Sequence, residues 1–578
     1  MVKTNVILSC STFLALMLPP SACVMAQSFH WKVVVNNAVT VPGDSRTFNS
    51  YSQPSVNVNE FVVFRARSKG GTTGEPAHGV FTRDMAQNGI VLTRFDRTTL
   101  VPPPNNLLST FVEPPAFPRI DMFSNTIASR GNHQPVWNYL LADGTETRAG
   151  TTGIYTDPFG FLITGASNLG SVSEFGFFAV PMQSTSLAGT MGFRFAAVSP
   201  TPIKFDVFPG APAVTDGSTI VFKGNYSVPD PNNTGALLSK TGVYFRNLTN
   251  GVIPLPGGQS LAPAGGMNPV VLIANSDTVI PGTDVRFGST APPSAARNQA
   301  VFAGFDNEDN PTKGGIYLAA LTGSSPRLTG LVQIGDAVPG ESKGSVFNKL
   351  GEGVSFDGQF VAFWGAWGTE TISLTLQCPT DGNKDVIAYC ARQYPNGFPA
   401  TIPQHQGIFV HNNKTGQVKV VAKSPTDFSD FVYWNFSGLV PGTGNSDETG
   451  EPARWRSASF VAVSGLSKEE EDSTYTAAFK ARTGSVSQGA YVSPVDGVYL
   501  RKGPGKSPIT TVVKTGMAGT TFDPEAIDPL TKVQLPVTAM GIERDGLRGK
   551  WLAISLSMGT EEAGWAGVYL SAIPDDDD

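Results

Sequence analysis

A three-residue signature recurs seven times along this chain: a glycine, a β-branched residue and an aromatic residue. Regular self-similarity is typical of repeat architectures, in which one unit cannot bury its apolar faces without its neighbours. The chain of 578 residues is therefore expected to contain seven copies of one structural unit rather than several unrelated domains. The seven copies are Gly79-Val80-Phe81, Gly153-Ile154-Tyr155, Gly242-Val243-Tyr244, Gly315-Ile316-Tyr317, Gly407-Ile408-Phe409, Gly497-Val498-Tyr499 and Gly567-Val568-Tyr569.

Each signature lies among short apolar runs that are separated by turn residues. Most copies follow a turn and an apolar strand, as in Asp357-Gly358 before residues 360–363, and another strand comes after them. Asn-Gly and Asp-Gly pairs between apolar runs indicate hairpins, because these residues accept positive φ at little cost. Each unit thus holds four strands, A to D, with the signature in strand C. We expect strand B at residues 460–463 in unit six, and an A–B turn at Arg544-Asp545-Gly546 in unit seven.

The two ends of the repeat region predict how the units close on one another. Unit seven ends at Pro574 without a strand D, whereas the segment Trp31–Val35 resembles strand D of unit four. Both segments are followed by Val-Pro-Gly, at Val41 and at Val338. We therefore predict an all-β fold over residues 27–574, a seven-bladed β-propeller with four antiparallel strands per blade. The N-terminal strand would complete the last blade and remove an exposed sheet edge.

Residues 1–26 have the features of a secretory signal peptide. Lys3 precedes an apolar run from Val6 to Leu18, and Val24-Met25-Ala26 forms a small-residue cleavage site. No later stretch is apolar and long enough to span a membrane. The mature protein is expected to be secreted and extracellular, or periplasmic in a Gram-negative host. The final residues, 575–578, are expected to form a solvated acidic tail.

Cysteine usage agrees with an oxidising compartment. Cys378 and Cys390 remain after removal of the signal peptide, and we predict that they form a disulfide. No set of residues has the spacing of a metal site. The formal net charge of −6 argues against a nucleic-acid partner, and we expect a monomer. In a eukaryotic host the glycosylation sequons would be Asn225, Asn232, Asn247, Asn413 and Asn435.

The Asp-Gly turn, the Val-Ala-Phe strand and the Gly-Ile-Tyr strand resemble the blades of TolB-type propellers. They resemble still more closely secreted proteins built from tandem repeats of the pattern Asn-x-x-Gly-x-x-Ala-Phe. The resemblance covers the mature chain and implies that the B–C and D–A loops share one face of the disc. It implies no catalytic residue, because propellers carry out many unrelated functions.

The B–C loops contain aromatic residues next to carboxylates, a combination that suits carbohydrate. Sugar C–H faces stack on aromatic rings, and carboxylates accept hydrogen bonds from hydroxyl groups. Paired carboxylates also serve glycoside hydrolysis, and they can bind calcium, so calcium is a possible cofactor. The simpler interpretation is that these side chains are solvated loop residues. The candidate ligand-binding residues are Trp137, Phe305, Asp306, Asp309, Trp367, Glu370, Glu561 and Trp565.

A second candidate set lies in the B–C loop of unit two. Arg130, His133 and Tyr139 could neutralise a uronate and abstract a proton from it, which would suit a polysaccharide lyase. A loop histidine without a special role is the simpler interpretation of His133.

The sequence therefore supports a secreted propeller that binds a glycan or a protein partner through its B–C and D–A loop face. The alternative is an extracellular polysaccharide-degrading enzyme, either a glycoside hydrolase or a lyase, that uses the loop carboxylates or the Arg130, His133 and Tyr139 set. A structural surface component without a discrete ligand is a third hypothesis.

Overall fold

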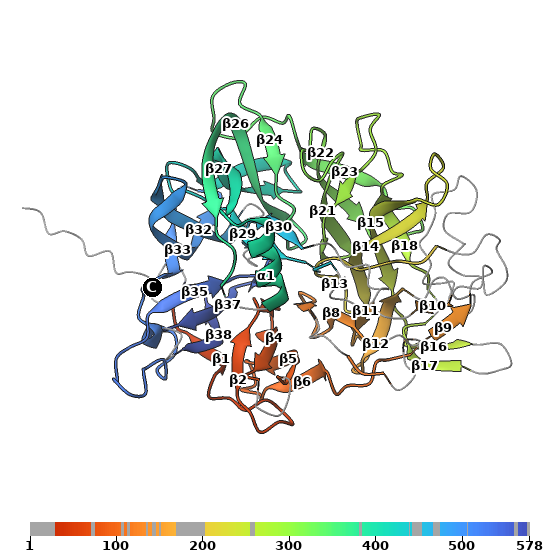
Figure 1. Ribbon diagram of the computed structural model, residues 1–578, viewed down its shortest axis with the longest axis horizontal. Helices are drawn as coiled ribbons and strands as arrows, with labels where there is room; N and C mark the ends of the chain where they lie inside the picture. The colour runs from red at the N-terminus through yellow and green to blue at the C-terminus, as the bar shows by residue number, and fades with distance from the viewer. Residues whose placement is uncertain are drawn as a thin grey trace, which may run out of the picture.

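The seven repeats fold into seven small antiparallel sheets arranged in a ring, as the computed structural model shows (Figure 1). The prediction of an all-β, seven-bladed propeller with four antiparallel strands per blade is confirmed. The structure describes residues 29–574 apart from 71–75, 104, 106–108, 112–115, 134–136, 141–145, 150–151, 169–202, 255–259, 267, 381–383, 439, 442–452, 466–473, 506 and 560–563. The predicted signal peptide and acidic tail lie outside the described residues.

Blades 1 to 4 follow one another along the chain, each running from an inner to an outer strand. Blade 1 comprises β2 (Phe48–Tyr51), β3 (Ser55–Val56), β4 (Phe61–Ser68), β5 (His78–Asp84) and β6 (Leu92–Asp96). Blade 2 comprises β7 (Ala116–Ile120), β8 (Ile127–Asn132), β11 (Thr152–Thr156) and β12 (Ile163–Ser167). Blade 3 comprises β13 (Ala213–Thr215), β14 (Thr219–Pro229), β15 (Leu237–Asn247) and β18 (Val271–Asn275). Blade 4 comprises β19 (Ser289–Thr290), β20 (Ser294–Ala296), β21 (Gln299–Phe305), β22 (Gly314–Ala320) and β23 (Leu328–Gln333).

Blades 5 to 7 complete the ring, and blade 7 takes its outer strand from the start of the chain. Blade 5 comprises β24 (Phe347–Leu350), β25 (Ser355–Phe356), β26 (Phe360–Leu376), β27 (Phe398–Asn412) and β28 (Gln417–Lys423). Blade 6 comprises β31 (Val461–Gly465), β32 (Tyr475–Ser487), β33 (Ala490–Gly503) and β34 (Thr510–Lys514). Blade 7 comprises β35 (Val537–Gly541), β36 (Leu547–Arg548), β37 (Trp551–Met558), β38 (Trp565–Ala572) and β1 (Lys32–Asn36).

The inner strands meet around the axis in the order β3, β7, β13, β20, β25, β31 and β36, and β36 returns to β3. Apolar side chains fill the spaces between neighbouring blades, as in the cluster of Phe305, Phe347 and Trp367 between blades 4 and 5. Burial of the sheet faces between blades is the main favourable contribution to folding. The ring is therefore closed by packing as well as by strand pairing.

The predicted closure by the N-terminal strand is confirmed. Strand β1 pairs antiparallel with β38, with Val33 opposite Tyr569 and Val35 opposite Val568. Both Val34 and Val35 are completely buried. The first described strand thus occupies the strand D position of the last blade and covers the edge of β38.

The signature glycine is explained by a bulge that all seven blades share at the C–D pairing. The register between strands C and D shifts next to each signature, and in blade 7 the shift lies between Val33 and Val35. A Cβ at Gly407 would lie 2.7 Å from the carbonyl oxygen of Ala422, and one at Gly567 would lie 2.7 Å from that of Val35. Only glycine permits this approach of the outer strand, so β1 follows the same rule as the other D strands.

A second glycine pattern, which the sequence analysis did not predict, places aromatic rings against strand B. In four blades a phenylalanine of the segment before or within the inner strand lies over a strand B glycine, where a Cβ would come within 2.5–2.7 Å of the ring. The pairs are Phe111 with Gly131, Phe205 with Gly224, Phe287 with Gly304, and Phe347 with Gly365.

Two strand assignments from the sequence are wrong. In blade 6, residues 461–463 belong to the inner strand β31, and β32 is the strand that pairs with the signature strand β33. The acidic run Glu469–Asp472, which falls between β31 and β32, lies outside the described residues. In blade 7, the A–B turn is formed by Gly549 and Lys550, not by Arg544-Asp545-Gly546. In blades 6 and 7 an inserted segment shifts the turn-and-strand pattern away from its usual position within the repeat unit.

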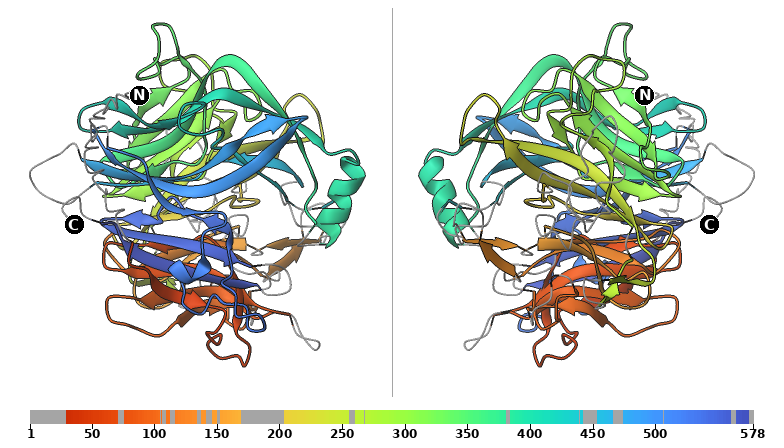
Figure 2. Two further views of the ribbon diagram at one scale, coloured as in Figure 1. Left: turned by 90° about the vertical axis from the view of Figure 1, so that its left-hand side faces the viewer. Right: turned by 90° about the vertical axis from the view of Figure 1, so that its right-hand side faces the viewer.

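Three two-stranded ribbons and one helix stand outside the blades. The ribbons are β9 (Trp137–Leu140) with β10 (Glu146–Ala149), β16 (Gly251–Pro254) with β17 (Ser260–Ala264), and β29 (Tyr433–Ser437) with β30 (Arg454–Ala458). The helix α1 (Lys384–Gln393) lies in the B–C connection of blade 5 and stands clear of the blades on one face (Figure 2). We call this face, where the B–C and D–A connections lie, the upper face. Within the described residues no helix is long and apolar enough to cross a membrane.

Candidate functional site

The inner strand of every blade is interrupted at a similar level, and this creates the candidate site. In four blades it consists of two short pieces that pair with the same strand B: β2 and β3, β19 and β20, β24 and β25, and β35 and β36. Blades 2, 3 and 6 have a register shift or an isolated bridge in the corresponding place. Proline and glycine occur at several interruptions, including Pro54, Pro292 and Gly353, as expected where a ladder is broken. The lower pieces form the ring around the axis.

The interruption in blade 7 fills the axis with charged side chains. We call residues 543–548 the axial plug. Its Asp545 forms ion pairs with Arg119 of β7 and with Arg548. Glu543 accepts a hydrogen bond of 2.8 Å from Arg119. The plug thereby ties blade 7 to blade 2, although blade 1 lies between them.

Two arginines of the plug reach the remaining side of the ring. Arg548 donates hydrogen bonds to the carbonyl oxygens of Phe356 (3.1 Å) and Val463 (3.2 Å), in blades 5 and 6. Arg544 donates to the carbonyl oxygen of Pro292 in blade 4, at 2.8 Å. One short segment therefore connects blades 2, 4, 5 and 6 to blade 7.

Burial makes the charges of the plug strongly interdependent. Arg119 and Arg548 are each 1% exposed and Asp545 is 5% exposed. Burial alone would raise the pKa of Asp545, but the guanidiniums of Arg119 and Arg548 hold that pKa below its usual range. Burial lowers the pKa of Arg544 to about 10, with a further contribution from the positive charge of Arg119. Arg544 thus remains charged at neutral pH.

A cavity of about 180 Å³ lies above the plug, and we call it the axial pocket. Its lining offers a carboxylate, a guanidinium, a hydroxyl and an aromatic ring, contributed by Glu543, Arg544, Ser459 and Phe460. The remaining lining residues are small or aliphatic: Gly210, Ala211, Gly353, Ala458 and Val461. The pocket is thus lined by the interruptions of the inner strands in blades 3, 5, 6 and 7.

A cap of inserted segments from blades 5 and 6 lies on the upper face, and its helix α1 stands over the middle of the ring (Figures 1 and 2). The cap consists of α1, the ribbon β29–β30 and the outer ends of the hairpins β26–β27 and β32–β33 (Figures 1 and 2). The predicted disulfide between Cys378 and Cys390 is confirmed and fixes α1 to the hairpin β26–β27. Cys390 packs with Phe436 and Trp455 of the ribbon. The cap is therefore a small hydrophobic unit with its own cross-link.

The cap is attached to the ring by polar contacts. Arg454 of β30 forms an ion pair with Glu308 in the B–C loop of blade 4 and lies 3.8 Å from Asp309. Beneath the cap, Asp430 accepts hydrogen bonds from Tyr491 (2.6 Å) and Gln406 (2.9 Å). Burial raises the pKa of Asp430, and these hydrogen bonds oppose the rise. Nearby, burial lowers the pKa of Lys480 to about 8; its ammonium lies 4.0 Å from the centre of the Tyr433 ring.

The structure describes two of the three predicted catalytic side chains of blade 2, those of Arg130 and His133. Arg130 lies in β8 and donates to the carbonyl oxygen of Phe208 at 3.4 Å. His133 is 4% exposed, with its ring 6.4 Å from that of Phe111 and 6.1 Å from that of Tyr155. Tyr139 and Trp137 lie in β9, and their side chains are outside the described part. His133 thus belongs to the packing of blade 2 in this structure.

The predicted ligand-binding residues are distributed over blades 2, 4, 5 and 7. Phe305 and Trp367 are buried in the core between blades 4 and 5, and Trp565 donates to Asp523 at 2.9 Å. The others form local polar contacts: Asp306 accepts from Thr312 at 2.6 Å, Glu370 lies 3.2 Å from His405, and Asp309 lies near Arg454. Glu561 is outside the described residues. None of the seven others lines the axial pocket through a described side chain.

Sequence reasoning missed Glu543, Arg544 and Phe460, the groups around the axis. A signal was present, because the run Glu543-Arg544-Asp545-Gly546-Leu547-Arg548 carries four charges in six residues next to an inner strand. It was interpreted as an ordinary A–B turn. Charged residues of this density are rarely buried unless they are paired, so the run indicates a structural or functional role at the axis.

The other expected features have defined positions. Of the sequons, Asn232, Asn247 and Asn435 are exposed, whereas the amide oxygen of Asn225 and the amide nitrogen of Asn413 are buried. In the described ranges, no three His, Cys, Asp or Glu side chains are grouped so that they could hold a metal ion.

No family model matches the chain, and no curated protein is similar to it in sequence. Among solved structures, it is similar to the polysaccharide lyase Uly1, with 9% identity over 95% of this chain and 97% of that chain and a TM-score of 0.35. The β-propeller domain of the Trilobed protease from Pyrococcus furiosus is 9% identical, with 64% and 81% coverage and a TM-score of 0.22. An exo-inulinase from Aspergillus awamori is 9% identical, with 95% and 98% coverage and a TM-score of 0.17. At these values the similarities carry no argument about function.

Proposed function

We propose that this protein is an extracellular propeller that binds a glycan in the axial pocket of its upper face. The observation that carries the proposal is the convergence of Phe460, Glu543 and Arg544 above a sealed axis. Pockets with a few convergent polar groups are the usual place for ligands.

The chemistry of the lining suits a sugar ring. Phe460 lines the pocket and would contact sugar C–H groups with the part of its ring that Tyr433 and Lys480 leave accessible. The carboxylate of Glu543, which accepts from Arg119, would accept further hydrogen bonds from hydroxyls. The guanidinium of Arg544 presents a planar set of donors that fits hydroxyl or carboxylate oxygens in pairs. Arg544 is already oriented by its bond to Pro292, so little conformational entropy is lost on binding.

Binding is better supported than catalysis. A glycosidase needs two carboxylates on either side of the scissile bond. In the axial pocket Glu543 is the one acidic residue among the described lining, and the neighbouring Asp545 is held by two arginines. The lyase set loses support because His133 packs against Phe111 and Tyr155.

The extracellular location rests on the disulfide of the cap together with the predicted signal peptide. Exposed Asn232, Asn247 and Asn435 would accept glycans in a eukaryotic host. We also propose that the protein acts as a monomer.

A glycan array with the secreted protein tests the proposal, using E543Q and R544K as pocket variants. We expect the wild type to bind at least one glycan and both variants to bind it at least tenfold more weakly. Because Glu543 also pairs with Arg119, binding is measured at a temperature at which thermal unfolding shows each variant to be folded. The rim variant E370Q is the matched control and should bind as the wild type does.

Absence of any bound glycan, or equal loss in E370Q and E543Q, would contradict the proposal. Incubation with the same polysaccharides tests for catalysis directly. New reducing ends would show a hydrolase, and reducing ends with the ultraviolet absorbance of unsaturated uronates would show a lyase.

A further inference from the structure

A second cavity lies at the seam where the ring closes, between blades 7 and 1. We call it the seam cavity; its volume is about 180 Å³, and it is lined by Tyr51, Gln53, Gly541, Ser555 and Ser557 together with three apolar positions. It is too small for a drug-sized ligand, which needs roughly 300 Å³ or more, but its size fits a single small ring.

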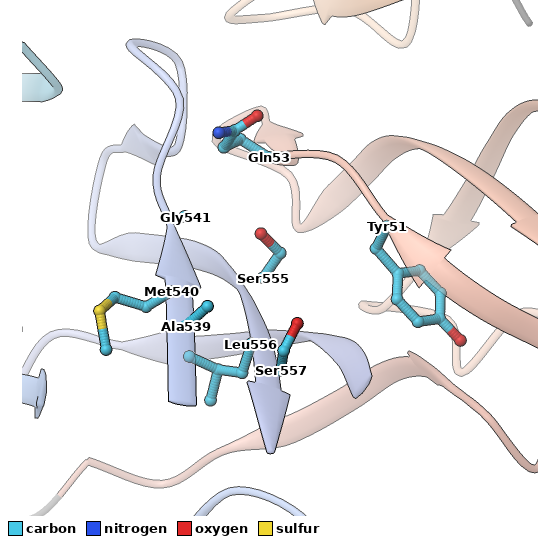
Figure 3. A pocket seen from close by; sticks show the side chains of 8 residues that line it. All are labelled: Tyr51, Gln53, Ala539, Met540, Gly541, Ser555, Leu556 and Ser557. Atoms are coloured by element: carbon cyan, nitrogen blue, oxygen red, sulfur yellow. The ribbon is translucent and has the colours of Figure 1, made fainter. Parts of the chain in front are cut away.

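The seam cavity presents polar side chains to a ligand. Ser555 is 8% exposed and Ser557 is exposed, and both line the cavity. Figure 3 shows Ser555 and Ser557 extending into the space between β37 and the segment that carries Tyr51 and Gln53. A ligand with hydroxyl groups could form hydrogen bonds with these side chains in place of water.

The lining of the seam cavity is uncharged, in contrast to the axial pocket. Its hydrogen-bonding side chains are two serines and one glutamine, whereas the hydroxyl of Tyr51 points away from the serines (Figure 3) and donates to Asn37 at 3.5 Å. Burial raises the pKa of the Tyr51 phenol, which therefore stays neutral. An ionic ligand would lose hydration here without gaining a counter-charge, whereas a neutral polyhydroxylated ring would find matching partners.

A glycine keeps the cavity open. A Cβ at Gly541 would lie 2.7 Å from both Cγ of Gln53 and Oγ of Ser555. Gly541 has no positive φ, so alanine suits its backbone conformation. The substitution G541A would therefore act mainly by filling the cavity.

The seam cavity and the axial pocket are neighbours. Gly541 lines the first and Glu543 lines the second, so their Cα atoms lie at most about 7 Å apart along the chain.

We propose that the seam cavity is a second subsite, which takes one neutral sugar residue of the glycan held in the axial pocket. This inference rests on the proposed function and adds a specificity to it. The glycan would carry a neutral sugar residue next to the sugar residue that contacts Glu543 and Arg544. Recognition would depend on hydroxyl hydrogen bonds to Ser555, Ser557 and Gln53.

Ligand-observed NMR with single neutral monosaccharides, such as glucose, galactose, mannose and xylose, tests the subsite without a known glycan. We expect saturation transfer to at least one of these sugars in the wild type, and a tenfold or greater loss in G541A. S555A should cause a smaller loss of saturation transfer. It provides a second test of the subsite if G541A does not fold. T538A, on the same strand but outside the cavity, is the matched control.

The outcomes separate the two proposals. If an array glycan binds the wild type and is weakened by E543Q but not by G541A or S555A, the seam subsite is wrong and the proposed function stands. If no array glycan binds but a monosaccharide signal is lost in G541A, the proposed function fails and the seam cavity remains a sugar site. If no monosaccharide gives a signal in the wild type, the seam subsite is wrong.

Discussion

The lower and upper halves of this propeller are built by different rules. In the lower half, seven short inner strands surround an axis that the plug fills with paired charges. In the upper half, the same strands are interrupted and the connections carry a helix, ribbons and a disulfide. The lower half therefore holds the ring together, whereas the varied connections of the upper half can form a binding site. The following predictions test this division, from the largest expected effect to the smallest.

The largest effect should come from D545N in the axial plug. The substitution leaves Arg548 buried without its paired carboxylate and leaves Arg119 with Glu543 alone, and breaking such a buried pair typically costs about 3–5 kcal/mol. Denaturant unfolding measures the loss. D309N near the cap is the control, because that pair is exposed and should cost less than about 1 kcal/mol. Equal effects would show that the plug does not hold the ring.

The same residue predicts an acid response. The pKa of Asp545 is lower in the folded protein than in the unfolded chain, where it is about 3.9. The ion pairs therefore contribute full stability above about pH 4, and this contribution is lost as the pH falls through the folded pKa. The difference in unfolding free energy between the wild type and D545N should shrink below pH 4. A constant difference down to pH 2 would contradict the assignment.

Reduction of the Cys378–Cys390 disulfide should loosen the cap and leave the blades intact. The bridge closes a loop across 12 residues, for which chain entropy predicts roughly 3 kcal/mol. Hydrogen exchange should accelerate in α1 and in β29–β30. Exchange in the inner strands β3 and β20 serves as the internal control, and acceleration there would mean that the cap and ring unfold together.

The glycine signature predicts a smaller, local loss in G567A. The added Cβ would press on the carbonyl oxygen of Val35 and push β1 away from β38, at a cost of about 1–3 kcal/mol. Faster exchange of the β1 amides would locate the effect at the closing seam. G505A provides the control, because a Cβ there meets no atom within 4 Å. Equal stability of G567A and the wild type would mean that the bulge does not require glycine.

The smallest effect concerns Lys480, where the cap meets blade 6. Since burial lowers the pKa of Lys480 to about 8, its charged form is disfavoured in the folded protein. Stability should therefore rise between pH 8 and about pH 10.5 as the unfolded chain keeps the proton longer. K480M should be more stable than the wild type by about 1 kcal/mol at pH 7, where Lys480 is charged, and less so at pH 10. A pH-independent difference would contradict this.

The lower half could be predicted from the sequence because every blade has the same physical requirements. Each C–D bulge needs the signature glycine, and each blade needs apolar strands, so seven copies of one pattern specify seven blades. The closing strand was predictable for the same reason: Val33–Val35 had to meet the bulge at Gly567.

The candidate site was less predictable because it depends on segments that do not repeat. Phe460 and Glu543 are 83 residues apart in the chain and meet only because both interrupt inner strands at the axis. Exposed aromatic and acidic residues were expected in the B–C loops, but Phe305 and Trp367 proved to be core residues. Sequence position within a loop did not show which side chains turn inward.

The most direct test is an experimental structure of the protein with a glycan that it binds. We expect the sugar in the axial pocket, in contact with Phe460, Glu543 and Arg544 above the plug. Sugar bound only on the outer rim or at the lower face would contradict the assignment of the axis as the binding site.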